Sequence, residues 1–166
     1  MSVHGFSLIE VLMVVFVMGI VVVVGSQLFF SVLKGASKTE LVKQVKQNGD
    51  YALGVMERQI RSAKSIKECT PTSLRIVNQD DNETVFTCLL QDDVNKIASN
   101  SSTLTGNSVT LGSGACPGSL LFDCNGATLT PPKVTVTFSL YQKGSSTRPE
   151  EQAQLFFQQT ISLRTY

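Results

Sequence analysis

The chain has 166 residues and a formal net charge of +1. This length provides one domain's worth of sequence plus an apolar terminus, and the charge gives neither a basic field for nucleic acid nor an acidic excess for a cationic partner. No G-x-S-x-G, H-E-x-x-H, Walker or dinucleotide motif occurs, so the sequence supports no hydrolase, nucleotide or redox-enzyme function. It predicts no catalytic residue, no metal and no cofactor, and His4 has no nearby catalytic partner.

A long uncharged segment begins close to the N-terminus. Residues 11–33 contain no charge, and Glu10 stands alone at their head. As a helix the segment would be about 34 Å long, which matches the hydrocarbon thickness of a bilayer. It therefore predicts a transmembrane helix that can also be extracted into a partner assembly. A single acid in such a segment is costly and functional by default.

Past Lys34 the apolar pattern becomes one-sided. Apolar residues recur at three- and four-residue steps, at Leu41, Val45, Ala52, Met56, Ile60, Ala63 and Ile66. This periodicity predicts an amphipathic helix, continuous from Ser7 to Ile66 and about 90 Å long. Gly49 is the weak point at which the rod could bend, and Thr70-Pro71 is expected to end the helix. No domain of this size can cover such a rod, so its exposed part needs lipid or partner helices.

The remaining sequence predicts β-strands. The alternation at Leu74 and Ile76 and in residues 85–90 predicts a hairpin around the turn Asp80-Asp81-Asn82. Residues 91–132 show little pattern, with short strand candidates at 109–111 and 120–122. The clearest alternation comes last, in residues 134–140 and 155–163, joined by the polar linker 143–151. We expect an α+β fold with one antiparallel sheet, whose apolar face the C-terminal half of the long helix covers.

Four cysteines, Cys69, Cys88, Cys116 and Cys124, follow the apolar segment. They allow three pairings, and the tight C-x-x-C spacing of zinc sites is absent. Disulfides are favoured over free thiols or a metal, in the sequential pairing Cys69–Cys88 and Cys116–Cys124, and they predict an oxidising compartment. Four lysines directly after the apolar segment conflict with this location: Lys34, Lys38, Lys43 and Lys46. By the positive-inside rule they would keep the C-terminal part in the cytoplasm.

Two charged clusters have a functional and a structural interpretation. Asp80-Asp81-Asn82-Glu83 and Asp92-Asp93 are candidate calcium ligands, but their spacing fits a solvated turn better. Four cations, Arg58, Arg61, Lys64 and Lys67, are expected on the helix before the sheet. They could contact DNA phosphates, although a solvated or subunit-facing surface is favoured because aromatic interleaving is missing and acids dilute the charge.

The stretch Gly5-Phe6-Ser7-Leu8-Ile9-Glu10, followed by an uncharged helix, resembles the N-terminus of type IV pilins and pseudopilins. The resemblance implies a pilin fold and cleavage between Gly5 and Phe6 by a membrane peptidase, which then methylates the new terminus to N-methylphenylalanine. It also implies that Glu10 pairs with the terminal amine of a neighbouring subunit during assembly. Two charges that each resist lipid would then neutralise one another and select the register.

The implied organisation is a leader at 1–5, a transmembrane and polymerisation helix at 6–33, an amphipathic helix at 34–66 and a disulfide-bonded β-domain at 67–166. The implied partners are other pilin or pseudopilin subunits, prepilin peptidase, an inner-membrane assembly platform and, before assembly, lipid. The location would be the inner membrane, with a single span and a periplasmic or extracellular C-terminal domain, and then the filament. No nucleic-acid partner is expected.

The sequence departs from the family in its leader, which has no lysine or arginine, and in lacking the proline common further along the helix. Residues 49–66 and the ending FFQQTISLRTY look like minor subunits that prime assembly or sit at the tip. A minor subunit of a type IV pilus or type II secretion pseudopilus is therefore favoured. The alternatives are a major pilin, a DNA-uptake or adhesive module, and a single-pass membrane protein that does not assemble.

Overall fold

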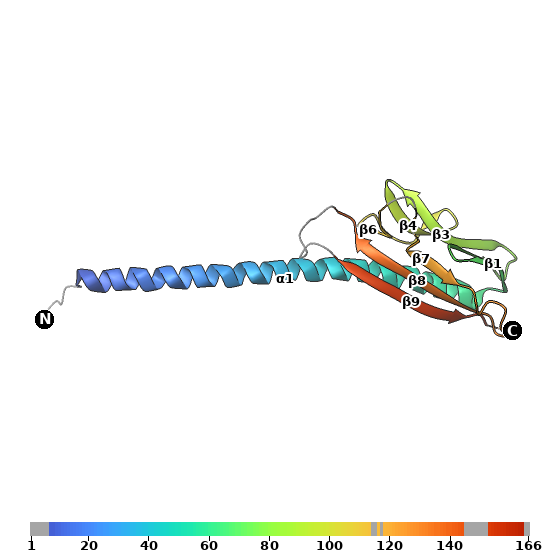
Figure 1. Ribbon diagram of the computed structural model, residues 1–166, viewed down its shortest axis with the longest axis horizontal. Coiled ribbons are helices and arrows are strands. Elements are labelled where there is room, and N and C mark those ends of the chain that lie inside the picture. Colours follow the sequence, from blue (N-terminus) through green and yellow to red (C-terminus); the bar gives the residue numbers. More distant parts are fainter. Residues whose placement is uncertain (1–6, 114–115, 117, 145–152, 165–166) are drawn as a thin grey trace.

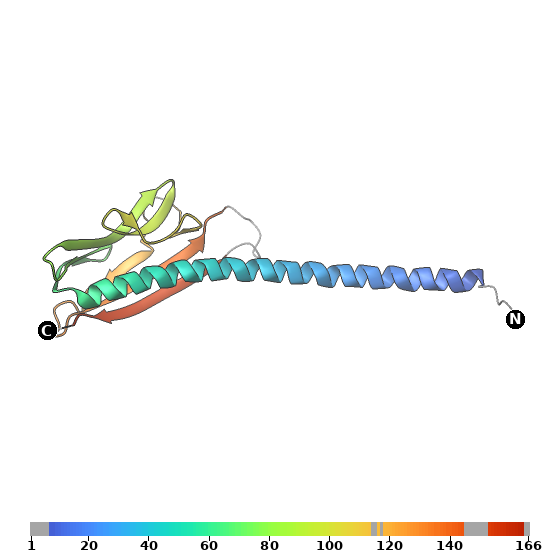
Figure 2. The ribbon, with the colours of Figure 1, turned by 180° about the vertical axis from the view of Figure 1, so that it is seen from behind.

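Helix α1 runs unbroken from Leu8 to Ser62 in the computed structural model. The structure describes residues 7–113, 116, 118–144 and 153–164. At 1.5 Å per residue, the 55 residues of α1 span about 82 Å. Figures 1 and 2 show a nearly straight rod whose N-terminal part projects alone, while all the strands lie beside its C-terminal part. The predicted long helix is confirmed, and Gly49 does not interrupt it.

The C-terminal end of α1 differs from the prediction. The helix ends at Ser62 and not at Ile66, and strand β1 (Ser65–Thr70) follows almost at once. Two contacts divert the backbone here: the Lys64 N–H donates to the Val77 carbonyl at 2.8 Å, and Gln79 Nε2 donates to the Ser62 carbonyl at 3.0 Å. Ile66 still packs against the core, but from a strand, so its helical spacing was misleading.

The first sheet has five antiparallel strands in chain order: β1, β2 (Ser73–Val77), β3 (Glu83–Gln91), β4 (Val94–Ser99) and β5 (Ser102–Thr103). The predicted hairpin is confirmed, with Leu74 opposite Phe86. Thr70-Pro71, expected to end the helix, instead begins the β1–β2 turn. Strand β4 was missed because its buried residues 94–98 include the polar Asn95 and Lys96, which interrupt the apolar run expected of a buried strand. A strand buried on both faces shows no alternation.

The second sheet contains the strands that the sequence predicted best. Strand β8 (Lys133–Gln142) is central and pairs with β6 (Val109–Thr110), β7 (Leu120–Asp123) and β9 (Gln154–Ser162). The single sheet we expected is therefore wrong in number, although the fold class, a long helix on antiparallel β-structure, is confirmed. The sheets meet where the Leu111 N–H donates to the Asn95 carbonyl at 3.0 Å.

The core joins α1 and both sheets, with Leu74, Ile76, Phe86 and Ile97 from the first sheet in the same cluster as α1 and the second sheet. Val45, Ala52, Met56 and Ile60 on the helix are fully buried. The inner face predicted for residues 134–140 and 155–163 is buried at Val134, Val136, Phe138, Leu140, Phe157, Ile161 and Leu163, whereas Leu155 is only half-buried. The ring of Phe157 stacks on Phe138, with centroids 5.0 Å apart, and lies against the backbone at Gly49. A Cβ on Gly49 would be 2.1 Å from the Phe157 ring. The lack of a side chain at Gly49 thus leaves room for the Phe157 ring, and the residue is not a hinge.

Disulfides join the two sheets, and the sequential pairing we expected is wrong. Cys69 pairs with Cys124, which directly follows β7, and Cys88 on β3 pairs with Cys116 in the β6–β7 connection. Strand β2 lies between β1 and β3. Cys69 and Cys88 are therefore two strand spacings apart, roughly 10 Å. That exceeds the Cα separation of about 7 Å that a disulfide tolerates.

Candidate assembly surface of the N-terminal helix

The N-terminal half of α1 has no covering structure within the described chain. Every large apolar side chain in residues 8–33, called here the exposed half, is between 47% and 78% exposed. The helix is long and apolar enough to cross a membrane. Soluble monomers rarely expose a continuous apolar surface of this extent. The surface therefore requires either lipid or other apolar helices.

The few polar groups inside the exposed half are compatible with either environment. Ser26 Oγ donates to the Val22 carbonyl at 2.7 Å, so its hydroxyl is satisfied within the helix. Gly19 leaves a shallow apolar groove lined by Val15, Phe16, Ile20, Val23 and Val24. Small residues allow helix backbones to approach closely when no hydrophobic force drives helices together in lipid. The groove at Gly19 is thus a place where a neighbouring helix can pack.

Glu10 lies in the first turn of α1, directly before the uncharged residues. Its N–H donates to the Ser7 carbonyl at 3.0 Å, and its side chain is exposed. Within the described part of the chain no cation forms an ion pair with this carboxylate. The helix dipole favours an acid at this end. Gly5 and Phe6, the predicted cleavage and methylation residues, lie outside the described residues, so their roles and that of Glu10 stay predictions.

Residues 1–26 match the family model described as the prokaryotic N-terminal methylation motif. The chain carries the type IV pilin and pseudopilin signature. This motif indicates a pilin or pseudopilin that prepilin peptidase processes, and it implies a structural subunit that assembles with other pilin subunits. Together with the apolar helix, it indicates membrane anchoring before filament assembly. Comparisons with curated proteins and with solved structures found no match.

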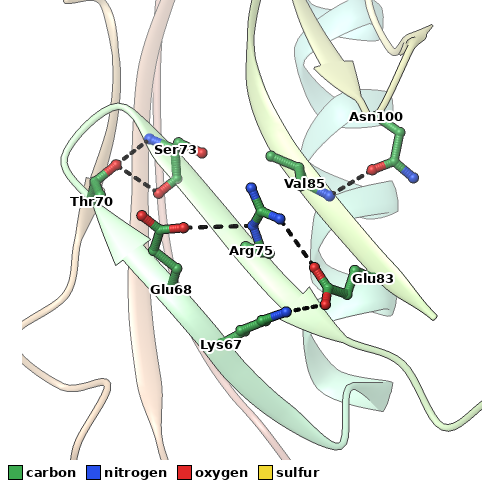
Figure 3. Close-up of polar contacts among 8 residues, drawn as sticks. All are labelled: Lys67, Glu68, Thr70, Ser73, Arg75, Glu83, Val85 and Asn100. Atoms are coloured by element: carbon green, nitrogen blue, oxygen red, sulfur yellow. Dashed lines mark hydrogen bonds and ion pairs between the residues drawn. The ribbon is translucent and has the colours of Figure 1, made fainter. Parts of the chain in front are cut away.

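The four cations with a possible DNA-contacting role are not arranged as a basic helix face. Lys64 and Lys67 lie beyond the end of α1, and Lys67 is on β1. Arg61 pairs with Glu57 at 2.7 Å and Lys64 with Asp81 at 2.6 Å. Lys67 donates to Glu83, which also accepts from Arg75 Nη1 at 3.1 Å, as Figure 3 shows.

Two acidic side chains of the β-domain, Asp80 and Glu83, lie in contacts that lower their pKa values. The hydrogen bond from Lys67, and then that from Arg75, holds the pKa of Glu83 below its ordinary value. The side-chain amide of Asn82, 2.6 Å from Asp80, lowers the pKa of Asp80. Across the described ranges, no group of three or more His, Cys, Asp or Glu residues could hold a metal ion.

One cation cluster was not predicted. Arg58, Arg61, Ser62 and Arg164 line one cavity, called here the arginine pocket. Arg164 reaches it because its N–H donates to the Arg61 carbonyl at 3.2 Å. No pattern in the sequence connects Arg164, near the C-terminus, with two arginines on the helix. Only the path of β9 back along α1 brings them together.

Proposed function

We propose that this chain is a structural subunit of a type IV pilus or a type II secretion pseudopilus. Prepilin peptidase cuts it between Gly5 and Phe6 and methylates Phe6. The observation that carries the proposal is the methylation motif at residues 1–26, joined to a helix half whose apolar side chains are all exposed. The methylation motif and the exposed apolar surface both point to assembly, because the processed terminus belongs to the same helix that needs partners.

Glu10 supplies the register of assembly. Cleavage would create a positive amine on Phe6, four residues or about 6 Å before Glu10 along the helix. A lone carboxylate in an apolar environment is unfavourable, and so is a lone ammonium. When one subunit's amine meets the next subunit's Glu10, both charges are neutralised, and a small axial offset between the two rods is selected.

Within this family we favour a minor subunit that primes assembly or sits at the tip, on the strength of residues 49–66 and of the C-terminal ending. The rival is a major pilin, and abundance in sheared filaments separates the two. We place the precursor in the inner membrane with its β-domain in the periplasm or outside the cell. The two disulfides support an oxidising compartment for that domain.

The test is the intact mass of the membrane-purified protein together with a Glu10→Gln variant. We expect a mass lacking residues 1–5, carrying one methyl group and two disulfides. We also expect Glu10→Gln to lower incorporation into filaments at least tenfold, while Glu40→Gln, an exposed acid on the same helix, assembles normally. A native polypeptide that retains residues 1–5, or a Glu10→Gln protein that assembles like the parent, would refute the proposal.

A further inference from the structure

The arginine pocket holds more positive charge than its surroundings neutralise. It has a volume of about 200 Å³ at the C-terminal end of α1. Arg61 is paired with Glu57, whereas Arg58 and Arg164 form no ion pair with any carboxylate in the described ranges. Guanidinium groups are always charged and present several donors in a plane, a geometry suited to carboxylates. The pocket is therefore equipped for an anionic group from outside the chain.

An uncompensated negative charge lies on the β3–β4 turn. Asp92 and Asp93, called here the acidic turn, are adjacent and exposed, and neither forms an ion pair within the described part of the chain. The cation that follows in sequence, Lys96, is buried and donates to Gln91 Oε1 at 3.3 Å. The two carboxylates thus remain available for an external cation.

These two charged regions lie at opposite ends of the β-domain. The ion pair of Lys64 with Asp81 places the β2–β3 turn next to the end of α1, where the arginine pocket is. Strand β3 then runs away from that end for nine residues, about 30 Å, before it reaches the acidic turn. Figures 1 and 2 show β3 extending from the α1 terminus back toward the middle of the rod. One chain therefore cannot bring its own acidic turn into its own pocket.

We propose that the acidic turn of one copy of this chain docks into the arginine pocket of another copy. This inference rests on the proposed function as a filament subunit. A contact between different surfaces of identical copies builds an open helical filament when its rotation does not close into a ring. It offsets two rods by at most about 30 Å, the length of β3, so helices about 82 Å long still overlap over most of their length. The pairing of the amine with Glu10 needs an offset of only about 6 Å, so the two contacts join different neighbours.

Cross-linking of the full-length processed protein in detergent tests the contact. The Arg164→Lys variant keeps the charge and adds an amine that a carbodiimide can join to a carboxylate. We expect a link between Lys at position 164 and Asp92 or Asp93. When light and heavy nitrogen-labelled proteins are mixed equally, mixed-label links should be about as frequent as both single-label links together. The links Lys64–Asp81 and Lys46–Asp50, with N–O distances of 2.6 and 3.1 Å, should stay single-label and report a folded protein.

A second variant separates charge from folding. Asp92 and Asp93 have φ angles of 53° and 58°, in the left-handed region where Asn-Gly is the preferred two-residue hairpin turn. The Asp92→Asn/Asp93→Gly variant should therefore retain its melting temperature. With the acids gone, we expect it to incorporate less well than the parent into filaments formed by the processed chain.

The outcomes of the two proposals are distinguishable. If the internal links form and the mixed-label link at position 164 does not, the contact is overturned. It is overturned equally if the Asn-Gly variant incorporates into filaments like the parent. Retention of residues 1–5, or normal assembly of Glu10→Gln, instead refutes the proposed function.

Discussion

The two halves of α1 share one unbroken backbone and have opposite surroundings. In residues 8–33 every large apolar side chain is exposed, whereas in residues 41–62, called here the covered half, the apolar stripe at Val45, Ala52, Met56 and Ile60 is fully buried. Hydrophobicity alone does not decide which half is covered, since the more apolar half is the uncovered one. The pattern decides: a one-sided stripe fits one sheet, and an apolar surface all round needs surroundings on every side.

The two halves obtain their stability from different sources. The covered half depends on the packing of its own β-domain, including the stacked pair Phe138 and Phe157. The exposed half depends on partners outside the chain, and its backbone hydrogen bonds are complete within the helix. Substitutions in the β-domain should therefore weaken the covered half and leave the exposed half helical. Substitutions in the exposed half should change assembly and not folding.

Removal of the Cys69–Cys124 disulfide should give the largest loss of stability. This disulfide joins residues 55 apart in the sequence and restricts the unfolded chain. The Cys69→Ser/Cys124→Ser variant should therefore lose about 4 kcal/mol of unfolding free energy, because its unfolded chain regains that conformational entropy. Denaturant unfolding of the detergent-solubilised protein, followed by circular dichroism, measures this loss. Helical signal from the exposed half should persist after the β-domain unfolds.

Peptide mapping of the parent protein without reduction is the matching control. It should recover Cys69 linked to Cys124 and Cys88 linked to Cys116. Recovery of Cys69 linked to Cys88 would contradict the strand order on which this prediction rests.

Gly49→Ala should destabilise the covered half by about 1–3 kcal/mol, although alanine is the better helix former. The new Cβ would lie 2.1 Å from the Phe157 ring, which is held by its stacking on Phe138. Thermal unfolding measures the change. Gly54→Ala is the matched control on the same helix, where the nearest atom would be Arg58 Nη1 at 3.7 Å. It should gain up to about 1 kcal/mol. Equal behaviour of the two variants would show that the ring does not need the glycine.

Secondary structure was predicted correctly from the sequence where a segment follows a single hydrophobic period. The uncharged segment, the stripe on α1 and the alternation in β8 and β9 each follow one period, and all three are as predicted. The boundary at Ser62 was missed because Ile66 continues the helical spacing while contacts from Val77 and Gln79 redirect the backbone. Those contacts come from a hairpin later in the chain, so local pattern could not reveal them.

In the candidate assembly surface and the arginine pocket, too, local features were predicted and features that depend on topology were missed. The exposed half and Glu10 are local features, and the sequence showed them directly. The disulfide pairing and the arginine pocket depend on the order of strands. Cys69 and Cys88 are near in sequence but separated in space by β2, and Arg164 meets Arg61 only because β9 returns along α1. Topology of this kind has no signature in spacing.

Acidification should lower the stability of the β-domain by less than the Gly49→Ala substitution does. Hydrogen bonds from Lys67 and Arg75 keep the folded-state pKa of Glu83 below its ordinary 4.5. A carboxyl with a depressed pKa stabilises the fold above its unfolded pKa, and this stabilisation disappears as the pH falls below about 4.5 through the folded value. We expect Glu83→Gln to lower the melting temperature at pH 7 by a few degrees at most, since the ion pairs are exposed.

As the pH falls through the lowered folded-state pKa of Glu83, the melting curves of the parent and the Glu83→Gln variant should converge, because Glu83 becomes protonated in the parent. Glu40→Gln, which removes an exposed acid 3.8 Å from Lys43 on α1, is the control. A constant difference between Glu83→Gln and the parent at every pH would show that Glu83 acts through packing and not through charge.

Gly19→Ala should have the smallest effect on stability and is the sharpest test of the exposed half. A Cβ at this position meets no atom within 4 Å in the single chain. The unfolding free energy of the β-domain should therefore stay within about 0.5 kcal/mol of the parent, the usual range for an exposed substitution. Filament yield should fall, because the added methyl group fills the groove at which a neighbouring helix packs. Gly35→Ala also has free space around its Cβ but lies beyond the uncharged segment, so it should alter neither measurement. If Gly19→Ala changed the melting of the β-domain and left the filament yield intact, the exposed half would be part of the folded core rather than a surface for partners.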